Sequence, residues 1–250
     1  MTGHNGNGDA EQESAREFRG AFPEVDEKMK LYRAYESPSD LPAVIPVFPL
    51  VEALLLPRRP LPLSIFEPRY LAMVDDALSG ERLIGMIQPS EREEAAGPWP
   101  ALCSVGCVGR ITQFAETGDG RCFITLTGVA RFRVIGEATT TRPYREAHVD
   151  FTGFAQDFRE GEGESAVDRP GLLSALRKFA EARKFEVDWN DIKQASNEAL
   201  VNGLSMLSPY GPREKQALLE AADLKARADM LVAITQMELA RGDDAPSQIH

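Results

Sequence analysis

Short β-prone runs, separated by prolines and glycines, fill residues 41–152 and constrain the fold of this chain more than any other feature. The runs span residues 44–50, 54–57, 61–66, 83–88, 105–114, 121–127, 131–137 and 144–151. One helical stretch interrupts them. Pro68 suits the first turn of a helix, and the helical spacing of apolar residues ends at Gly80. Gly106 and Gly109 suit bends of the kind that curl a sheet. This pattern predicts a small, mostly antiparallel β-barrel with one helix.

Prolines and glycines within these runs give more local predictions. Pro46 and Pro49 cannot donate ladder hydrogen bonds, so the first run is expected at a sheet edge or with its prolines at strand ends. Residues 117–120 (Thr-Gly-Asp-Gly) predict a hairpin turn. Gly128 predicts another turn between two strands.

Beyond residue 169 the apolar residues recur at helical spacing, which predicts four helices joined by short links. Asp168 caps the first, Asp188 or Asn190 caps the second, residues 213–221 form the third, and Asp223 caps the last. Four short-linked helices predict a small bundle. The expected organisation is a flexible extension over 1–40, a barrel over 41–152, an acidic linker over 153–169, a helical bundle over 170–242 and a flexible tail over 243–250. Within the extension, residues 1–20 are expected to be disordered, and the aromatic residues of 22–35 predict a docking segment.

The charge balance restricts the partners. The net charge is −11, with 28 basic and 39 acidic residues, whereas a nucleic-acid-binding protein normally carries a basic surface. However, every base in residues 41–150 is arginine, which serves both interaction surfaces and internal ion pairs. A nucleic-acid-binding alternative therefore stays open on Arg110, Arg121, Arg131, Arg133, Arg142 and Arg145. No apolar run could span a membrane and the first ten residues lack a secretory core, so a cytoplasmic protein without a membrane partner is expected.

The sequence offers little catalytic chemistry. It contains no Gly-Lys pair, hence no phosphate-binding Walker A loop. Of its three histidines only His148 falls in an expected strand, and no Gly-x-Ser-x-Gly motif accompanies it. Three cysteines argue against a disulfide framework, and their spacing suits buried strand positions better than zinc binding. No catalytic residue, metal or cofactor is therefore expected. A hydrolase remains an alternative that rests only on scattered serines and aspartates.

Several motifs occur together in a recognisable order. They are 45–50 (Ile-Pro-Val-Phe-Pro-Leu), 67–70 (Glu-Pro-Arg-Tyr), 105–111 (Val-Gly-Cys-Val-Gly-Arg-Ile), 128–134 (Gly-Val-Ala-Arg-Phe-Arg-Val) and 214–220 (Glu-Lys-Gln-Ala-Leu-Leu-Glu). Over residues 41–240 the chain resembles the N-terminal, substrate-recognising domain of Lon proteases. The resemblance implies an α+β fold, with a PUA-like β pseudobarrel carrying one helix followed by a C-terminal α-helical bundle.

The same resemblance implies a non-catalytic module that binds unfolded or client polypeptides. The chain resembles a free-standing copy of that domain, because the ATPase and the Ser-Lys protease that follow it in Lon proteases are missing. An adaptor or chaperone-like role is expected, with an AAA+ protease as a further partner. PUA-like relatives bind RNA or small ligands, so those alternatives stay open.

Candidate polypeptide contacts lie where the corner around Phe66, Arg69 and Tyr70 meets the strand carrying Met86 and Gln88. Methionine adapts to varied apolar partners, and arginine and tyrosine are common interface anchors. The competing interpretation makes Phe66 a plain core residue and pairs Arg69 with a local carboxylate.

Overall fold

The computed structural model describes residues 35–90 and 99–243, with side chains described up to residue 241. The predicted disordered head, nearly all of the predicted docking segment and the predicted tail lie outside these residues. The last residue of that segment, Tyr35, is described and packs against buried core residues. The described strands are β1 (Val44–Pro49), β2 (Pro60–Ile65), β3 (Leu83–Ile87), β4 (Val105–Glu116), β5 (Cys122–Glu137) and β6 (Arg145–Asp150). The described helices of this half are η2, a 3-10 turn at Pro38–Asp40, and α2 (Pro68–Leu78).

The six strands form one sheet that closes on itself. Their order is β2-β5-β4-β3-β1-β6, and a further pairing of β5 with β6 completes the ring. The long strand β5 makes this closure because its first half pairs with β2 and its last residues pair with β6. All pairings are antiparallel except β1 with β3. The predicted mostly antiparallel barrel with one helix is confirmed.

Prolines in β1 lie where the ladder tolerates them. The strand pairs with β6 through Val44–Val47 and with β3 only from Val47 onward, so Pro46 precedes the second ladder. Pro49 is the last residue of the strand. Both positions avoid the loss of a backbone hydrogen bond between two neighbours, as expected for proline.

The turn predicted at Gly128 is wrong, because this glycine lies inside β5. A Cβ atom at this position would lie 2.1 Å from the carbonyl oxygen of Leu56. The loop before β2 therefore crosses so close to β5 that only glycine fits. In that loop the predicted extended run at 54–57 forms no strand; instead, its three leucines are buried in the core.

Seven helical segments follow the barrel within the described residues. They are two 3-10 segments, η3 (Thr152–Phe158) and η4 (Glu164–Ala166), and the α-helices α3 (Arg169–Arg183), α4 (Trp189–Gln194), α5 (Asn197–Leu207), α6 (Pro212–Glu220) and α7 (Leu224–Asp243). The Asp168 side chain accepts a hydrogen bond from Gly171 N, and Asp188 rather than Asn190 caps the second helix. That second helix is wrong in extent, because Ser196 caps a new helix and divides it into α4 and α5.

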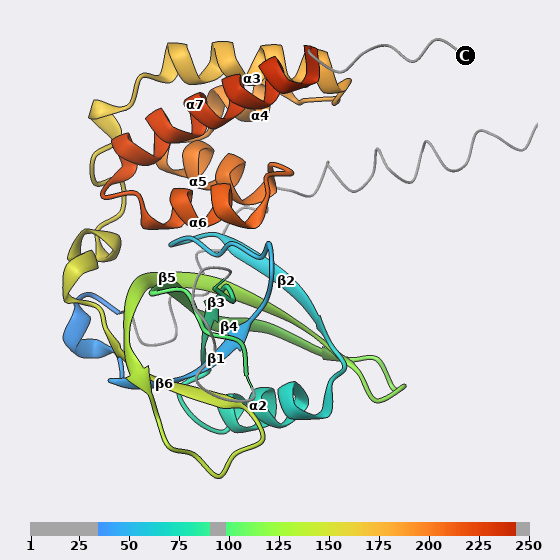
Figure 1. Ribbon diagram of the computed structural model, residues 1–250, viewed down its shortest axis with the longest axis vertical. Coiled ribbons are helices and arrows are strands. Elements are labelled where there is room, and N and C mark those ends of the chain that lie inside the picture. Colours follow the sequence, from blue (N-terminus) through green and yellow to red (C-terminus); the bar gives the residue numbers. More distant parts are fainter. Residues whose placement is uncertain (1–34, 91–98, 244–250) are drawn as a thin grey trace, which may run out of the picture.

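Residues 153–169, predicted as an acidic linker, contain η3 and η4 and pack tightly. Phe154, Asp157 and Val167 are buried, and η3 lies against β5. Figure 1 shows the helices α3–α7 stacked over one end of the barrel and α2 at the opposite end. One hydrophobic cluster runs from the barrel into the bundle and includes Leu55 and Leu219. Within the described residues, none of the helices combines the length and the apolar character that crossing a bilayer requires.

Candidate functional site

A hollow of about 500 Å³ opens at the end of the barrel that faces away from the helical bundle. We call it the groove. It is bordered by the end of β1, the start of α2, residues 89 and 99–100, and the connection between β5 and β6. The lining residues are Pro49, Arg69, Tyr70, Pro89, Trp99, Pro100, Glu137, Ala138, Thr139, Thr140, Arg142, Pro143, Tyr144, Arg145 and Glu146. A volume of this size is typical of sites that bind small ligands or short chain segments.

Arg69 contacts two aromatic rings of the groove. Its guanidinium carbon is 4.5 Å from the centre of the Tyr70 ring and 5.0 Å from that of Trp99. Its Nε donates to Glu67 Oε2 over 2.9 Å, and its Nη2 lies 2.8 Å from the same oxygen. Cation–π contacts and an ion pair thus fix the orientation of the guanidinium. The predicted pairing of Arg69 with a local carboxylate is present, and the same residue also lines the groove.

The floor of the groove is built from buried aromatic residues. The Tyr70 ring packs on Phe48 with 4.2 Å between ring centres, and burial raises the pKa of the Tyr70 hydroxyl. Because Tyr70 belongs to the first turn of α2, the helix start at Pro68 positions both Arg69 and Tyr70. These rings give the groove an apolar surface under a charged border.

The opposite wall is held by two arginine-centred networks. The Tyr144 hydroxyl donates to Asp76 Oδ2 over 2.6 Å, and Arg142 donates to both groups. Burial, followed by the hydrogen bond to Asp76, raises the pKa of Tyr144 to about 12. Arg145 Nε donates to Glu137 over 3.0 Å and its Nη1 donates to Pro100 O over 2.8 Å. Arg145 thereby fixes the main chain next to Trp99.

The structure separates the residues that the sequence grouped as one site. Arg69 and Tyr70 line the groove, whereas Phe66 is 61% exposed and is not among the lining residues. Met86 is buried in the core. Gln88 is buried and donates to Pro212 O over 3.1 Å, so its side chain connects the barrel to α6. Contact between these five residues and a polypeptide stays a prediction, and burial leaves Met86 and Gln88 no exposed surface for it.

Sequence reasoning missed Trp99, Arg142 and Tyr144 as parts of the site. Trp99 stands between two prolines after a charged loop, and an aromatic residue so placed was a usable signal. Tyr144 lay at the start of a predicted strand, and nothing in the sequence indicated that it faces α2. Both line the groove, where Arg145 at the start of β6 bonds to the carbonyl oxygen of Pro100.

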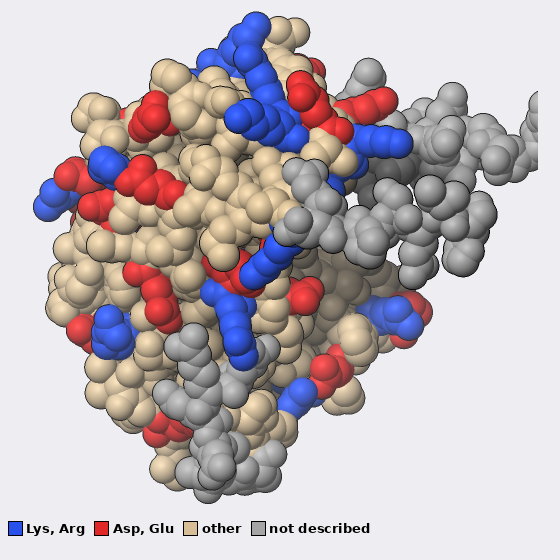
Figure 2. All heavy atoms as spheres, turned by 45° about the horizontal axis from the view of Figure 1, so that its top comes forward, with Lys and Arg blue, Asp and Glu red and all other residues tan. Residues whose placement is uncertain are grey.

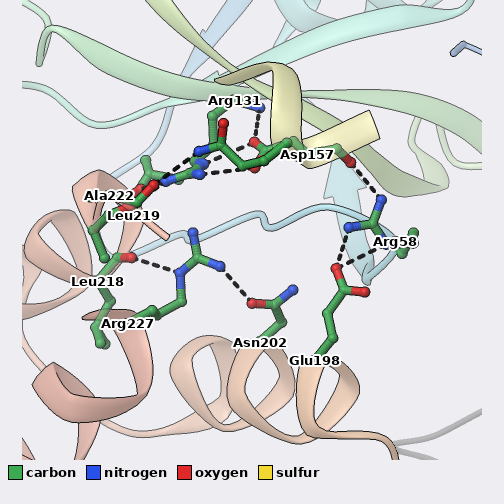
Figure 3. A network of polar contacts seen from close by, with 11 residues as sticks. Arg58, Arg131, Asp157, Glu198, Asn202, Leu218, Leu219, Ala222 and Arg227 are labelled. Atoms are coloured by element: carbon green, nitrogen blue, oxygen red, sulfur yellow. Dashed lines mark hydrogen bonds and ion pairs between the residues drawn. The ribbon is translucent and has the colours of Figure 1, made fainter. Parts of the chain in front are cut away.

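A second polar network joins the barrel to the bundle, and we call it the joint (Figure 3). Arg131 is buried and pairs through Nε and Nη2 with the two oxygens of Asp157, each over 2.8 Å. Its Nη1 donates to Leu219 O over 3.1 Å and to Ala221 O. Arg58 Nη1 donates to Asp157 O over 2.6 Å, and its Nε donates to Glu198 of α5 over 2.9 Å. Side chains of the barrel are thus bonded directly to helices of the bundle.

Arg227 completes the joint from the side of the bundle. Its Nε donates to Leu218 O over 2.9 Å and its Nη1 to Asn202 Oδ1 over 2.8 Å. Burial lowers the pKa of Arg227 to about 10, which leaves the side chain protonated at neutral pH. Arg131, Asp157 and Arg227 are buried inside the fold, whereas the Arg58 side chain is 32% exposed, and the joint positions the two parts.

The six arginines of the nucleic-acid alternative are dispersed and largely engaged. Arg131 is in the joint, Arg145 is buried beside Glu137, and Arg142 pairs with Asp76. Arg121 lies 3.5 Å from Asp119. Figure 2 shows acidic and basic side chains interspersed over the face that it views, without a broad area of one sign. No observation favours a nucleic-acid surface.

Metal and thiol chemistry find no support in the described part of the chain. No group of three or more histidine, cysteine, aspartate or glutamate side chains is arranged there to hold a metal ion. Cys103, Cys107 and Cys122 are free thiols, and burial raises the pKa of the Cys107 thiol. A thiol so placed is a poor nucleophile.

Comparison with known proteins gives one consistent family. Residues 44–236 match the family model described as the ATP-dependent protease La (LON) substrate-binding domain. The chain is 28% identical over 219 residues to the Lon protease of Dictyoglomus thermophilum, covering 83% of this chain and 26% of that protein. It is 28% identical over 204 residues to Lon protease 2 of Myxococcus xanthus, covering 78% of this chain and 24% of that protein. The chain thus spans about a quarter of the length of these curated relatives.

Solved structures show the same fold. A Lon N-terminal domain protein from Xanthomonas campestris aligns with a TM-score of 0.53 and 22% identity, over 76% of this chain and 97% of that one. The N-terminal domain of a Mycobacterium avium complex Lon protease aligns with a TM-score of 0.57 and 19% identity, over 77% of this chain and 98% of that one. At this identity the likeness concerns the fold, and barrel and bundle are shared together.

Proposed function

The chain belongs to the family of Lon substrate-binding domains, and from this premise we propose that it binds unfolded or client polypeptides without carrying out chemistry on them. The observation that supports this most is the match over residues 44–236, which includes both the barrel and most of the bundle. We place the activity in the cytoplasm and describe it as adaptor-like or chaperone-like. An AAA+ protease that receives the bound polypeptide is part of the same proposal.

We assign the binding surface to the groove. Tyr70, Trp99 and Tyr144 line a space of about 500 Å³; Tyr70 and Tyr144 are buried in its wall, and Trp99 is exposed. Tryptophan, tyrosine and arginine are the residues that most often dominate binding energy at protein interfaces. Trp99 is 45% exposed, so a ligand can cover a large apolar area there. Phe66, the exposed member of the sequence-predicted set, stays a secondary contact of this proposal.

Binding to a permanently unfolded protein tests the proposal. Reduced and carboxymethylated lactalbumin, carrying a fluorescent label, is titrated with the full chain, and saturable binding is expected. Trp99→Ala is expected to weaken binding about tenfold, which is the loss of about 1.4 kcal/mol typical of an interface anchor. Phe185→Ala is the matched control, because Phe185 is also 45% exposed but belongs to the bundle. Circular dichroism of both variants verifies that the fold is intact.

Two outcomes contradict the proposal. If the full chain shows no saturable binding to the unfolded lactalbumin, the proposed polypeptide binding is wrong. Cleavage of the unfolded protein during incubation, with or without ATP, contradicts the statement that these residues carry out no chemistry. Affinity capture from native extract, with the full chain as bait, then determines whether an AAA+ protease is retained alongside client polypeptides.

A further inference from the structure

The main chain around the groove is poor in hydrogen-bond donors. Four lining residues, Pro49, Pro89, Pro100 and Pro143, have no N–H group. The N–H of Ala138 is already donated to Glu146 O over 2.9 Å. Binding a polypeptide by strand addition requires a row of available backbone N–H and C=O groups. The border of the groove does not offer such a row.

The sheet itself also resists strand addition. In the described strand order, β2 has β5 as its one neighbour, so its other side is a sheet edge. Arg59 O accepts from Gly128 N over 3.0 Å, which shows that residue 59 faces β5. Since backbone groups alternate in direction along a strand, Pro60 and Pro62 face away from β5. The open edge of β2 therefore lacks two backbone N–H groups that an added strand would need as hydrogen-bond donors.

Side chains supply the donors that the main chain lacks. Arg69 uses Nε and Nη2 for Glu67, and within the described residues its Nη1 has no acceptor. Trp99 adds an indole N–H, which is a donor only. The Trp99 ring, which is 45% exposed and lies 5.0 Å from the Arg69 guanidinium carbon, adds an apolar face. The groove therefore presents positive, donating groups and an aromatic face.

We infer that the groove binds its polypeptide as a polyproline II segment, with a proline residue against the exposed ring of Trp99 and peptide carbonyls facing Arg69 and the Trp99 indole. The inference rests on the proposed function and names its substrate class. A polyproline II segment makes no internal hydrogen bonds, so its carbonyl oxygens are available, and its prolines bring no N–H groups that would need acceptors. Donating side chains and a carbonyl-rich backbone are complementary in partial charge. An exposed aromatic ring beside hydrogen-bond donors suits such a segment, because the conformation of the segment is already formed before binding.

Three labelled peptides test the inference by fluorescence anisotropy with the full chain. One is (Pro-Pro-Leu)4, one is (Gly-Gly-Leu)4, and one alternates threonine and valine. The first is expected to bind at least tenfold more tightly than the other two, because the glycine peptide must lose more conformational freedom. Trp99→Ala and Arg69→Met are each expected to reduce its affinity several-fold, whereas Phe185→Ala leaves it unchanged.

Equal or tighter binding of the glycine or threonine–valine peptide overturns the inference, as does insensitivity of (Pro-Pro-Leu)4 binding to Trp99→Ala. The unfolded lactalbumin probe separates this failure from that of the proposed function. If lactalbumin binds in a Trp99-dependent manner and the proline peptide does not, only the polyproline II inference is wrong. If neither probe binds, both proposals are wrong.

Discussion

At the scale of single residues, position 128 requires glycine because the main chain of Leu56 crosses it closely. A Cβ atom there would lie 2.1 Å from Leu56 O and 2.7 Å from Leu56 C, and backbone atoms cannot move away as a side-chain tip can. Gly128→Ala is therefore expected to lower the free energy of unfolding by about 1–3 kcal/mol, the usual effect of overpacking. Gly136→Ala in the same strand is the control, because nothing lies within 4 Å of its added Cβ. Urea unfolding measures both, and equal stabilities of the two variants would contradict the account.

Tyr144 makes a prediction about alkaline pH. Its pKa in the folded protein is about 12, above the ordinary value of 10.0. Below pH 10.0 the hydroxyl is protonated in both states, so its hydrogen bond to Asp76 stabilises the fold in full. As the pH rises through 12, the folded protein also loses this proton and the contribution disappears.

The difference in unfolding free energy between wild type and Tyr144→Phe should thus be constant up to pH 10.0 and shrink towards pH 12. Denaturant unfolding over this range measures it. The phenolate absorbance that Tyr144→Phe removes should also appear near pH 12 rather than near 10.0. A tyrosine absorbance that titrates at 10.0 and vanishes in this variant would contradict the prediction.

At the scale of elements, the sequence predicted strands and helices well where a local rule applies. Pro68 and Gly80 bounded α2, and Asp168 marked the start of α3, because proline tolerance and capping depend on neighbouring residues. The turn predicted at Gly128 was wrong because glycine occurs both in turns and where two main chains approach closely. Only the position of the loop that crosses β5 distinguishes these two cases. The division of α4 from α5 was missed because the apolar spacing continues across Ser196 while its side chain caps α5.

At this scale, the prediction concerns association of two chains through the edge strand β2. Pro60 and Pro62 withhold two N–H groups from the open edge, so replacing both with threonine should create an edge that can pair with another chain. The double variant Pro60→Thr with Pro62→Thr is expected to associate with increasing protein concentration, which light scattering after size-exclusion chromatography detects. Ser64→Thr is the control, because position 64 of the same edge already has an N–H group. Concentration-independent mass of the double variant would contradict the prediction.

At the scale of the whole molecule, the joint should make barrel and bundle unfold together. The chain has two tryptophans, Trp99 in the barrel half and Trp189 at the start of α4. Fluorescence of a Trp99→Phe protein reports the bundle, and fluorescence of a Trp189→Phe protein reports the barrel. Both are expected to show the same urea midpoint, since one cooperative transition exposes both rings. Two clearly different midpoints would mean that the joint does not couple the parts.

Breaking the joint should separate these midpoints. Arg131→Met leaves Asp157 charged and buried without its partner, which typically costs about 3–5 kcal/mol. Added to each single-tryptophan protein, it is expected to lower the stability of both and to divide the transition into two. Arg133→Met is the control, because residue 133 lies on the same strand but is exposed. A single, unshifted transition in the Arg131→Met proteins would contradict the coupling.

The same scale explains why the sequence predicted the fold better than the site. Barrel and bundle follow from periodicity, which is local, and from the ordered motifs of the resemblance. The groove forms where α2, the segment at Trp99 and the β5–β6 connection converge, and no spacing in the sequence encodes that convergence. Arg69 and Tyr70 were found because a motif contains them, and Trp99 was not because none does.

On the bundle side of the joint, Leu218, Leu219 and Ala221 all accept hydrogen bonds through their backbone oxygens. Every amino acid has that oxygen, so these three hydrogen bonds do not depend on which apolar side chain stands at each position, and burial requires only that the side chains are apolar. The side chains that the joint does require are its donors Arg58, Arg131 and Arg227 and its side-chain acceptors Asp157, Glu198 and Asn202. A redesigned α6 with other apolar residues at positions 218, 219 and 221 should therefore keep its hydrogen bonds to Arg131 and Arg227 as long as the helix ends at the same place.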